Sequence, residues 1–243
     1  IMLADTLTIR DCESMWQNEN AFNDFFHALL TERANGDQLL RDHRNWIERH
    51  GYGFGDRAFH YVWKMLVDEM TSDFRFLEIG VFRGQVLSLI SLLASASGKR
   101  ASVHGVTPLN NRGDYCCTYP ESDYLQDIKT NYDAFNLPND YQLICGNSDD
   151  PNVISSALSR YYSIVYIDGG HDYTTVASDI KSYGSVVPSN GYLVMDDSSN
   201  FLNIGKCWAG IKQVSEAVRD VLEADRNFKH IFACGHLRVF RRL

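Results

Sequence analysis

The stretch 74-FRFLEIGVFRGQVLSLISLLASA-96 decides the fold, because it joins a short apolar run to a longer one through two glycines. The first run, 74–80, predicts a buried strand, and 84–96 predicts a helix that begins soon after the strand ends. Further apolar runs predict strands at 101–107, 141–146, 162–168 and 191–197. Helical stretches are predicted between and after them at 122–135, 151–160, 173–187 and 205–224. This alternation is typical of a parallel sheet wound with crossover helices.

The end of the chain predicts a different connection. Residues 228–234 and 237–243 are strand-like and flank a tight Gly235-His236 turn, which indicates a hairpin. We therefore predict an α/β fold. It is a Rossmann-like, doubly wound, mostly parallel seven-stranded sheet with an antiparallel last strand, preceded by an N-terminal helical segment.

That segment, residues 1–70, is followed by a Rossmann-like domain at 71–243. Apolar residues at three- and four-residue spacings predict helices at 13–34, 38–50 and 57–70. Its aromatic residues either pack these helices onto the core or form a lid over a ligand; they include Trp16, Phe22, Phe25, Phe26 and Trp63. Because the segment carries more apolar surface than one small core can cover, we expect the protein to form a homo-oligomer.

Composition argues against several classes of protein. The 243 residues carry a formal net charge of -8, which disfavours a nucleic-acid partner that must attract phosphates. No apolar run reaches the roughly 20 residues of a membrane span, and no secretory signal opens the sequence. The six cysteines lack a C-x-x-C pair, so we expect reduced thiols in a cytoplasmic protein. Cys145 is expected to be buried in its strand, and Cys116 and Cys117 to lie in a loop without chemistry.

The turn 77-LEIGVFRG-84 is the first candidate site. Gly80 lets the backbone turn sharply, and Gly84 lets a ligand or the sheet approach the start of the helix. The N–H groups at that helix start suit a carboxylate, such as that of a methionine moiety. A nicotinamide-binding G-x-G-x-x-G would need glycine where Phe82 and Gln85 stand, so the sequence disfavours a nicotinamide enzyme.

Carboxylates follow two later strands. Asp168 and His171 lie in 166-YIDGGHDYTTVASDI-180, and Asp196 and Asp197 lie in 194-VMDDSS-199. If these strands are neighbours, three carboxylates meet at the carboxyl edge of the sheet. Two of them about 4 Å apart repel by roughly 4 kcal/mol at an effective dielectric of 20, so the group needs a proton or a cation. Oxygen ligands suit Mg²⁺ or another hard divalent ion; the alternative is that Asp197 only caps the next turn and binds no metal.

Together these motifs resemble the metal-dependent O-methyltransferases of class I, which use S-adenosylmethionine. The resemblance extends to the catechol type and, through I-D-G-x-H-x-Y and M-D-D, more closely to the macrocin-type sugar O-methyltransferases. It implies a methionine end lined by Glu78, Gly80, Phe82 and Gly84, and an adenine end approached by Asn147 and Ser148. It likewise implies a metal held by Asp168, Asp196 and Asp197, with Asp168 also facing the cofactor and taking part in catalysis, and His171 as the general base.

One position departs from the family pattern. The second strand of these enzymes usually ends in an acidic residue that holds the ribose hydroxyls, and here Thr107 stands there. Either Asp149 or Asn110 supplies that contact, or cofactor binding is weak, or the ligand differs. The change is also compatible with a repurposed enzyme such as the cephalosporin hydroxylases, or with a non-catalytic binding protein.

The expected function is therefore S-adenosylmethionine-dependent, divalent-metal-assisted O-methyl transfer. The expected partner is a small-molecule hydroxyl acceptor, with a sugar or a glycosylated natural product as one candidate, and the expected cofactors are S-adenosylmethionine and Mg²⁺ or a similar ion.

Overall fold

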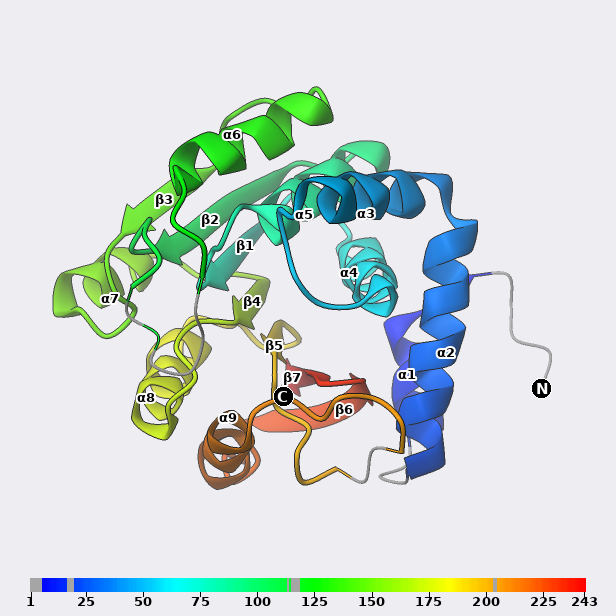
Figure 1. The fold of residues 1–243 in the computed structure, drawn as a ribbon. Helices are drawn as coiled ribbons and strands as arrows, with labels where there is room; N and C mark the ends of the chain where they lie inside the picture. The colour runs from blue at the N-terminus through cyan, green and yellow to red at the C-terminus, as the bar shows by residue number, and fades with distance from the viewer. Residues whose placement is uncertain (1–5, 17–19, 113, 115–118, 203–204) are drawn as a thin grey trace.

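A computed structural model describes residues 6–16, 20–112, 114, 119–202 and 205–243, with only the backbone described for residues 20–22. Within these residues, seven strands form one sheet in the order β3-β2-β1-β4-β5-β7-β6 (Figure 1). The strands are β1 (Phe74–Ile79), β2 (Ala101–Thr107), β3 (Gln142–Cys145), β4 (Ile164–Ile167), β5 (Tyr192–Met195), β6 (Phe228–Cys234) and β7 (Leu237–Arg242). Strands β1 to β5 pair in parallel, whereas β7 runs antiparallel to both β5 and β6. The predicted fold class is confirmed.

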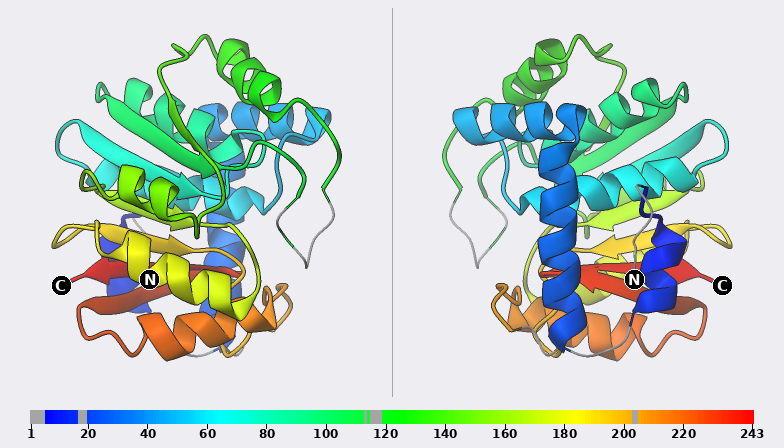
Figure 2. Two further views of the ribbon diagram at one scale, coloured as in Figure 1. Left: turned by 90° about the vertical axis from the view of Figure 1, so that its left-hand side faces the viewer. Right: turned by 90° about the vertical axis from the view of Figure 1, so that its right-hand side faces the viewer.

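Helices cover both faces of the sheet, as Figure 2 shows. They are α1 (Ile9–Met15), α2 (Asn20–Gly36), α3 (Gln38–His50), α4 (Arg57–Glu69), α5 (Gln85–Ala96), α6 (Tyr124–Ala134), α7 (Pro151–Ala157), α8 (Tyr173–Gly184) and α9 (Lys212–Ala217), which continues as a π-helical turn, Val218–Leu222. Buried side chains of α1 to α6 share one apolar core with one face of the sheet, while α7 to α9 pack on the other face.

The N-terminal helices pack directly on the sheet. Phe26 of α2 and Trp63 of α4 are buried in the same core as Phe76 of β1, so packing accounts for these two aromatic residues. The single helix predicted at 13–34 is wrong in detail. A capping box at Thr8 starts a separate helix at Ile9, which ends before α2 begins.

Three other predictions, two of element bounds and one of burial, differ from the structure. The strand expected at 191–197 ends at Met195, because Asp197 has a φ of 51° and leaves the extended conformation. The helix expected at 205–224 begins only at Lys212, since Gly210 forms an isolated bridge with Ser198. Cys145 is exposed at the edge strand β3 and not buried, while Cys116 and Cys117 lie outside the described residues.

No helix in the described part of the chain is both long and apolar enough to cross a membrane.

Candidate active site

A cavity of about 990 Å³ opens where the parallel strands β1 to β5 end at their carboxyl termini. This edge is where ligands bind in open α/β sheets. Most of the predicted site residues line the cavity: Gly80, Phe82, Thr107, Asn147, Ser148, Asp168, His171, Asp196 and Asp197. Two predicted residues, Glu78 and Gly84, do not line it.

The turn after β1 is held between its two neighbouring strands. The N–H groups of Gly80 and Val81 both donate to the carbonyl oxygen of Val106, at 3.0 and 3.2 Å. Gly80 has a φ of 96°, and a Cβ placed on it would lie 2.0 Å from the carbonyl oxygen of Asp168. Only glycine therefore fits, because any side chain would push the end of β4 away from β1.

Gly84 and Glu78 have other surroundings. A Cβ on Gly84, whose φ is 82°, would lie 3.1 Å from Ile128 of α6, so glycine here permits close helix packing. Glu78 is buried beside Tyr166 of β4. Burial, with a smaller contribution from the charge of Asp196, raises the pKa of Glu78 to about 8. Glu78 is thus a buried carboxyl group that does not line the cavity but raises the pKa of Asp168.

At the end of β2, Thr107 is buried and its hydroxyl accepts the N–H of Leu109 at 3.1 Å. That contact occupies one of the two acceptor lone pairs of the threonine hydroxyl. The exposed side chains of Asn110 and Asp149 line the same cavity. Polar groups other than Thr107 are therefore present near this end of the cavity.

Ser148 is tied to a buried acid of α8. Its hydroxyl donates to Asp179 at 3.0 Å, and the other carboxyl oxygen of Asp179 has no hydrogen-bond partner among the described residues. Burial raises the pKa of Asp179 to about 7, although the bond from Ser148 lowers it. The position of Ser148 thus depends on a carboxyl group that titrates near neutrality.

This arrangement predicts a pH-dependent stability. Because the folded state keeps the proton of Asp179 between its unfolded pKa of 3.8 and about 7, stability should fall as pH rises through that range and level off above it. Between pH 5 and pH 8 the loss should amount to about 3 kcal/mol, at about 1.4 kcal/mol per pH unit. Urea unfolding of wild type and Asp179→Asn across this range measures it. Equal pH slopes in the two proteins would contradict the assignment.

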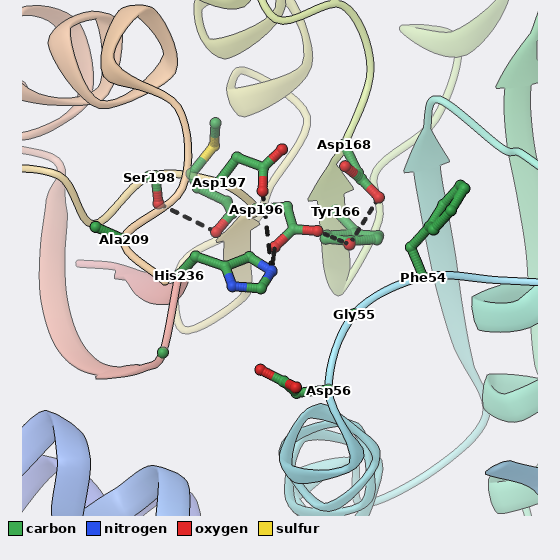
Figure 3. Close-up of polar contacts among 12 residues, drawn as sticks. Phe54, Gly55, Asp56, Tyr166, Asp168, Asp196, Asp197, Ser198, Ala209 and His236 are labelled. Atoms are coloured by element: carbon green, nitrogen blue, oxygen red, sulfur yellow. Dashed lines mark hydrogen bonds and ion pairs between the residues drawn. The ribbon is translucent and has the colours of Figure 1, made fainter. Parts of the chain in front are cut away.

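The acidic cluster consists of Asp168, Asp196 and Asp197, which follow strands β4 and β5. Asp168 and Asp196 lie on the face of the sheet that carries Glu78. Tyr166 contacts Asp168 at 3.0 Å and Asp196 at 2.9 Å through its hydroxyl group (Figure 3). One hydroxyl has one hydrogen to donate, so the other contact needs a proton on a carboxyl group. Burial, and then the charges of Asp196, Asp197 and Glu78, raise the pKa of Asp168 well above its usual range. Without a cation, the cluster is therefore held partly protonated.

His236 joins this cluster from the turn between β6 and β7. Its Nε2 lies 3.4 Å from Oδ1 of Asp196 and 3.8 Å from Oδ1 of Asp197. The sequence analysis missed His236, because only the placement of β7 beside β5 brings this turn to the carboxylates. Among the described residues, two groups have the spacing of metal ligands: Asp168, His171 and Asp197, and Asp196, Asp197 and His236.

His171 lies between two carboxylates. Its Nδ1 is 2.7 Å from Asp114 and its Nε2 is 3.0 Å from Asp197. Burial lowers the pKa of His171, but the hydrogen bonds and charges of Asp197 and Asp114 outweigh it and raise the pKa to about 9. The ring is thus cationic at neutral pH when both partners are charged. Neutralising Asp197 would remove part of that stabilisation and lower the pKa.

The N-terminal segment also reaches the cavity. Phe54 and Asp56, which precede α4, line it together with Trp208 from the loop before α9. Phe54 and Trp208 expose 61% and 58% of their surface, whereas core aromatic residues are buried. Such exposed rings at a cavity are suited to contact a ligand.

The sequence profile described as "Methyltransferase domain" matches residues 77–198, which are half of the chain and include the glycine turn and all three predicted metal-binding aspartates. The chain belongs to this methyltransferase-domain family. The match ends before the β6–β7 hairpin, so His236 lies outside it.

Comparison with individual proteins gives more distant matches. The uncharacterized protein R132 of Acanthamoeba polyphaga mimivirus is 29% identical over 152 residues, which are 60% of this chain. The match spans 62% of that relative, less than two thirds of its length.

Solved methyltransferase structures share the fold. The O-methyltransferase NovP superposes with a TM-score of 0.61 at 15% identity, over 76% of this chain and 79% of NovP. S-adenosylhomocysteine-bound PaMTH1 of Podospora anserina gives 0.62 at 11% identity, over 91% and 97% of the two chains. MycE of the mycinamycin pathway, in complex with Mg, S-adenosylhomocysteine and mycinamycin VI, gives 0.54 at 16% identity, over 83% of this chain and 54% of MycE.

Proposed function

We propose that this methyltransferase-domain protein transfers the methyl group of S-adenosylmethionine to a hydroxyl oxygen of a small molecule, assisted by a divalent cation. The observation that carries the proposal is that one cavity is lined by the glycine turn after β1, the acidic cluster and His171. The cavity volume of about 990 Å³ is at the upper end of the range for small-molecule sites, which gives room for a cofactor and an acceptor.

The residues around the cavity fit the cofactor in two regions. Gly80 and Phe82 would face its methionine end, and Thr107, Asn147 and Ser148 its adenosine end. Because the hydroxyl of Thr107 is partly engaged, we assign the ribose contact to Asp149 or Asn110. The presence of S-adenosylhomocysteine in PaMTH1 and MycE supports this choice of cofactor.

The chemistry of the donor set fits a divalent cation. Asp168, Asp196 and Asp197 crowd negative charge in a buried place, and Oδ1 of Asp196 is buried without a hydrogen-bond partner among the described residues. A hard divalent ion such as the Mg in MycE compensates such a group. When bound, it would stabilise developing charge on an acceptor oxygen and lower the pKa of the hydroxyl group.

His171 supplies the proton acceptor. In the proposed reaction the sulfonium–methyl bond breaks, an oxygen–methyl bond forms, and the hydroxyl proton passes to Nε2 of His171. Asp114 holds the opposite nitrogen, which orients the ring and stabilises the imidazolium that forms. The protein otherwise contributes by positioning, since a methyl group and an oxygen held about 3–3.5 Å apart react without covalent help from the chain.

The acceptor is assigned only by class. Phe54, Tyr119 and Trp208 give the cavity aromatic walls, and the acidic cluster gives it an oxygen-binding end. A hydroxylated small molecule with an apolar or ring-shaped face fits both features, and a sugar or glycosylated natural product has them. The homo-oligomer expected from the sequence stays a prediction, which sedimentation at micromolar concentration tests.

Calorimetry with S-adenosylhomocysteine, with and without Mg²⁺, tests the cofactor assignment. We expect binding by wild type and a roughly tenfold loss of affinity in Asp149→Asn, because a hydrogen bond to a charged group contributes about 1.5–3 kcal/mol. Asp140→Asn is the matched control, since Asp140 is exposed and does not line the cavity. Equal affinities in all three proteins would transfer the ribose contact to Asn110, and absence of binding by wild type would refute the proposed cofactor.

Thr107 also favours a second candidate, a repurposed enzyme on the same fold. β2 ends in Thr107, at the position where the resemblance to metal-dependent O-methyltransferases implies an acidic residue. In that case the protein would bind a divalent cation but not S-adenosylhomocysteine, so the same titrations separate the two functions.

A further inference from the structure

His236 forms the wall of the acidic cluster on the side of the β6–β7 turn. Its Nε2 faces Oδ1 of Asp196 at 3.4 Å and Oδ1 of Asp197 at 3.8 Å (Figure 3). These distances exceed the usual N–H···O range of about 2.7–3.2 Å. Ligand atoms bound at about 2.1 Å lie about 3.0 Å apart around an octahedral ion and about 3.4 Å apart around a tetrahedral one. The nitrogen is therefore spaced from both oxygens nearly as in the ligand set of one ion, and ligand atoms of the three residues all lie within 4.8 Å of one another.

The Asp196 oxygen that faces His236, Oδ1, makes no hydrogen bond to the described residues. Asp196 is 9% exposed, and its Oδ1 is buried with no hydrogen-bond partner among the described residues, while its Oδ2 accepts from Tyr166. Leaving a buried carboxylate oxygen unsatisfied costs free energy. A cation between Asp196, Asp197 and His236 would remove that cost.

The imidazole is also fixed in place. Phe59 and Trp208 contact its ring edge-to-face, with centroid distances of 4.7 and 4.8 Å. The carbonyl oxygen of His236 accepts the N–H of Ser198 at 3.0 Å, so the two turns that carry the cluster are joined directly. A ring held in this way loses little freedom when it binds an ion.

The other histidine is less suited to bind the ion. His171 has both ring nitrogens in short contacts with carboxylates, at 2.7 and 3.0 Å, and Asp114 holds its far side. If His171 accepts the substrate proton, its Nε2 must stay free of the cation. The ion then belongs with Asp196, Asp197 and His236.

We propose that His236 is a direct ligand of the cation, together with Asp196 and Asp197, and that this nitrogen makes the site select a first-row transition-metal ion over Mg²⁺. The proposal rests on the cation site of the proposed function. Imidazole is a good ligand for Fe²⁺, Ni²⁺ and Zn²⁺, and Co²⁺ falls between Fe²⁺ and Ni²⁺ in the order of affinities, whereas Mg²⁺ prefers oxygen and retains its water. Nδ1 of His236 is buried without a hydrogen-bond partner among the described residues, and Asp56, which lines the same cavity, lies on the far side of the ring in Figure 3.

Metal titration of the cation-free full chain, without cofactor or acceptor, tests the proposal. We expect wild type to bind Co²⁺ and Zn²⁺ at least about a hundredfold more tightly than Mg²⁺, because a nitrogen ligand favours these ions over one that prefers oxygen. His236→Gln should weaken Co²⁺ binding tenfold or more and change Mg²⁺ binding less than threefold. His50→Gln, which removes an exposed histidine outside the cavity, is the matched control and should leave the affinity for Co²⁺ within threefold of wild type, whereas His171→Gln should not weaken it.

The absorption spectrum of bound Co²⁺ gives a readout that needs no turnover. We expect bands of a nitrogen-containing ligand set in wild type and in His171→Gln, and their loss in His236→Gln. Wild type with a purely oxygen-ligated Co²⁺ spectrum would overturn the proposal even if the variants failed to fold. Loss of the bands in His171→Gln alone would also overturn it, because the ion would then be bound by Asp168, His171 and Asp197. Binding of S-adenosylhomocysteine is measured separately, so failure of the proposed methyl transfer is distinguishable from failure of the metal assignment.

Discussion

His171→Gln is expected to slow methyl transfer by a hundred- to ten-thousand-fold, the range typical of a lost general base. Glutamine keeps a polar side chain at the cavity but cannot accept the proton. Affinity for S-adenosylhomocysteine should stay within a few-fold of wild type, because the ring lies at the carboxylate end of the cavity. Single-turnover rates with a methyl-donor assay measure the change. A variant that retains a tenth or more of the wild-type rate would show that another group takes the proton.

The pH dependence of the same reaction tests the assignment through Asp114. In the cation-free protein, the bonds and charges of Asp197 and Asp114 overcome the effect of burial and raise the pKa of His171 to about 9. A base acts in its deprotonated form, so the wild-type rate should rise with pH, along a limb that lies below this value because the cation engages Asp197. Asp114→Asn removes one of the two anions, lowers the pKa of the imidazolium, and should move the rising limb to lower pH. A limb that stays in place would exclude His171 as the titrating group.

The positions of the first carboxylates were predictable because they depend on the sheet. The apolar runs that end in Asp168 and in Asp196-Asp197 are long enough to be strands, and parallel strands present their carboxyl ends at one edge. The register pairs Tyr166 with Val194. Asp168 and Asp196 lie two residues further along these neighbouring strands and therefore on the same face of the sheet. Alternation and topology therefore determine where these groups meet.

The rest of the cluster depends on contacts that periodicity does not encode. His236 is a turn residue in the sequence, and it approaches Asp196 only because β7 inserts between β5 and β6. Asp114 comes from a loop, and its contact with His171 has no repeating pattern. Glu78 and Gly84 were placed on the ligand by resemblance, whereas in the structure Glu78 is buried and does not line the cavity, and Gly84 packs against Ile128. Motifs located the strand ends, and side-chain directions within them required the structure.

Asp196→Asn should make the cation-free protein more stable and at the same time remove its divalent-cation binding and methyl transfer. Burial and the charge of Asp197 raise the pKa of Asp196, and Asp196 in turn raises the pKa of both Asp168 and Glu78. A neutral amide relieves this repulsion, by on the order of 1–4 kcal/mol at the effective dielectric of such sites. Thermal unfolding in chelator, with metal titration and single-turnover assays, measures all three effects.

The order of stabilities should reverse when the cation is added. A ligand that binds only the folded state stabilises it by mass action, so wild type should gain about 4.1 kcal/mol at a thousandfold excess over its dissociation constant, while Asp196→Asn gains almost nothing. Asp220→Asn, which removes an exposed carboxylate on the π-helical turn after α9, is the matched control and should respond like wild type. A structural cluster would behave in the opposite way, because Asp196→Asn would then gain no stability in chelator and the cation would stabilise neither protein. If Asp196→Asn is more stable than wild type in chelator and is not stabilised by the cation, the carboxylates serve to bind a cation.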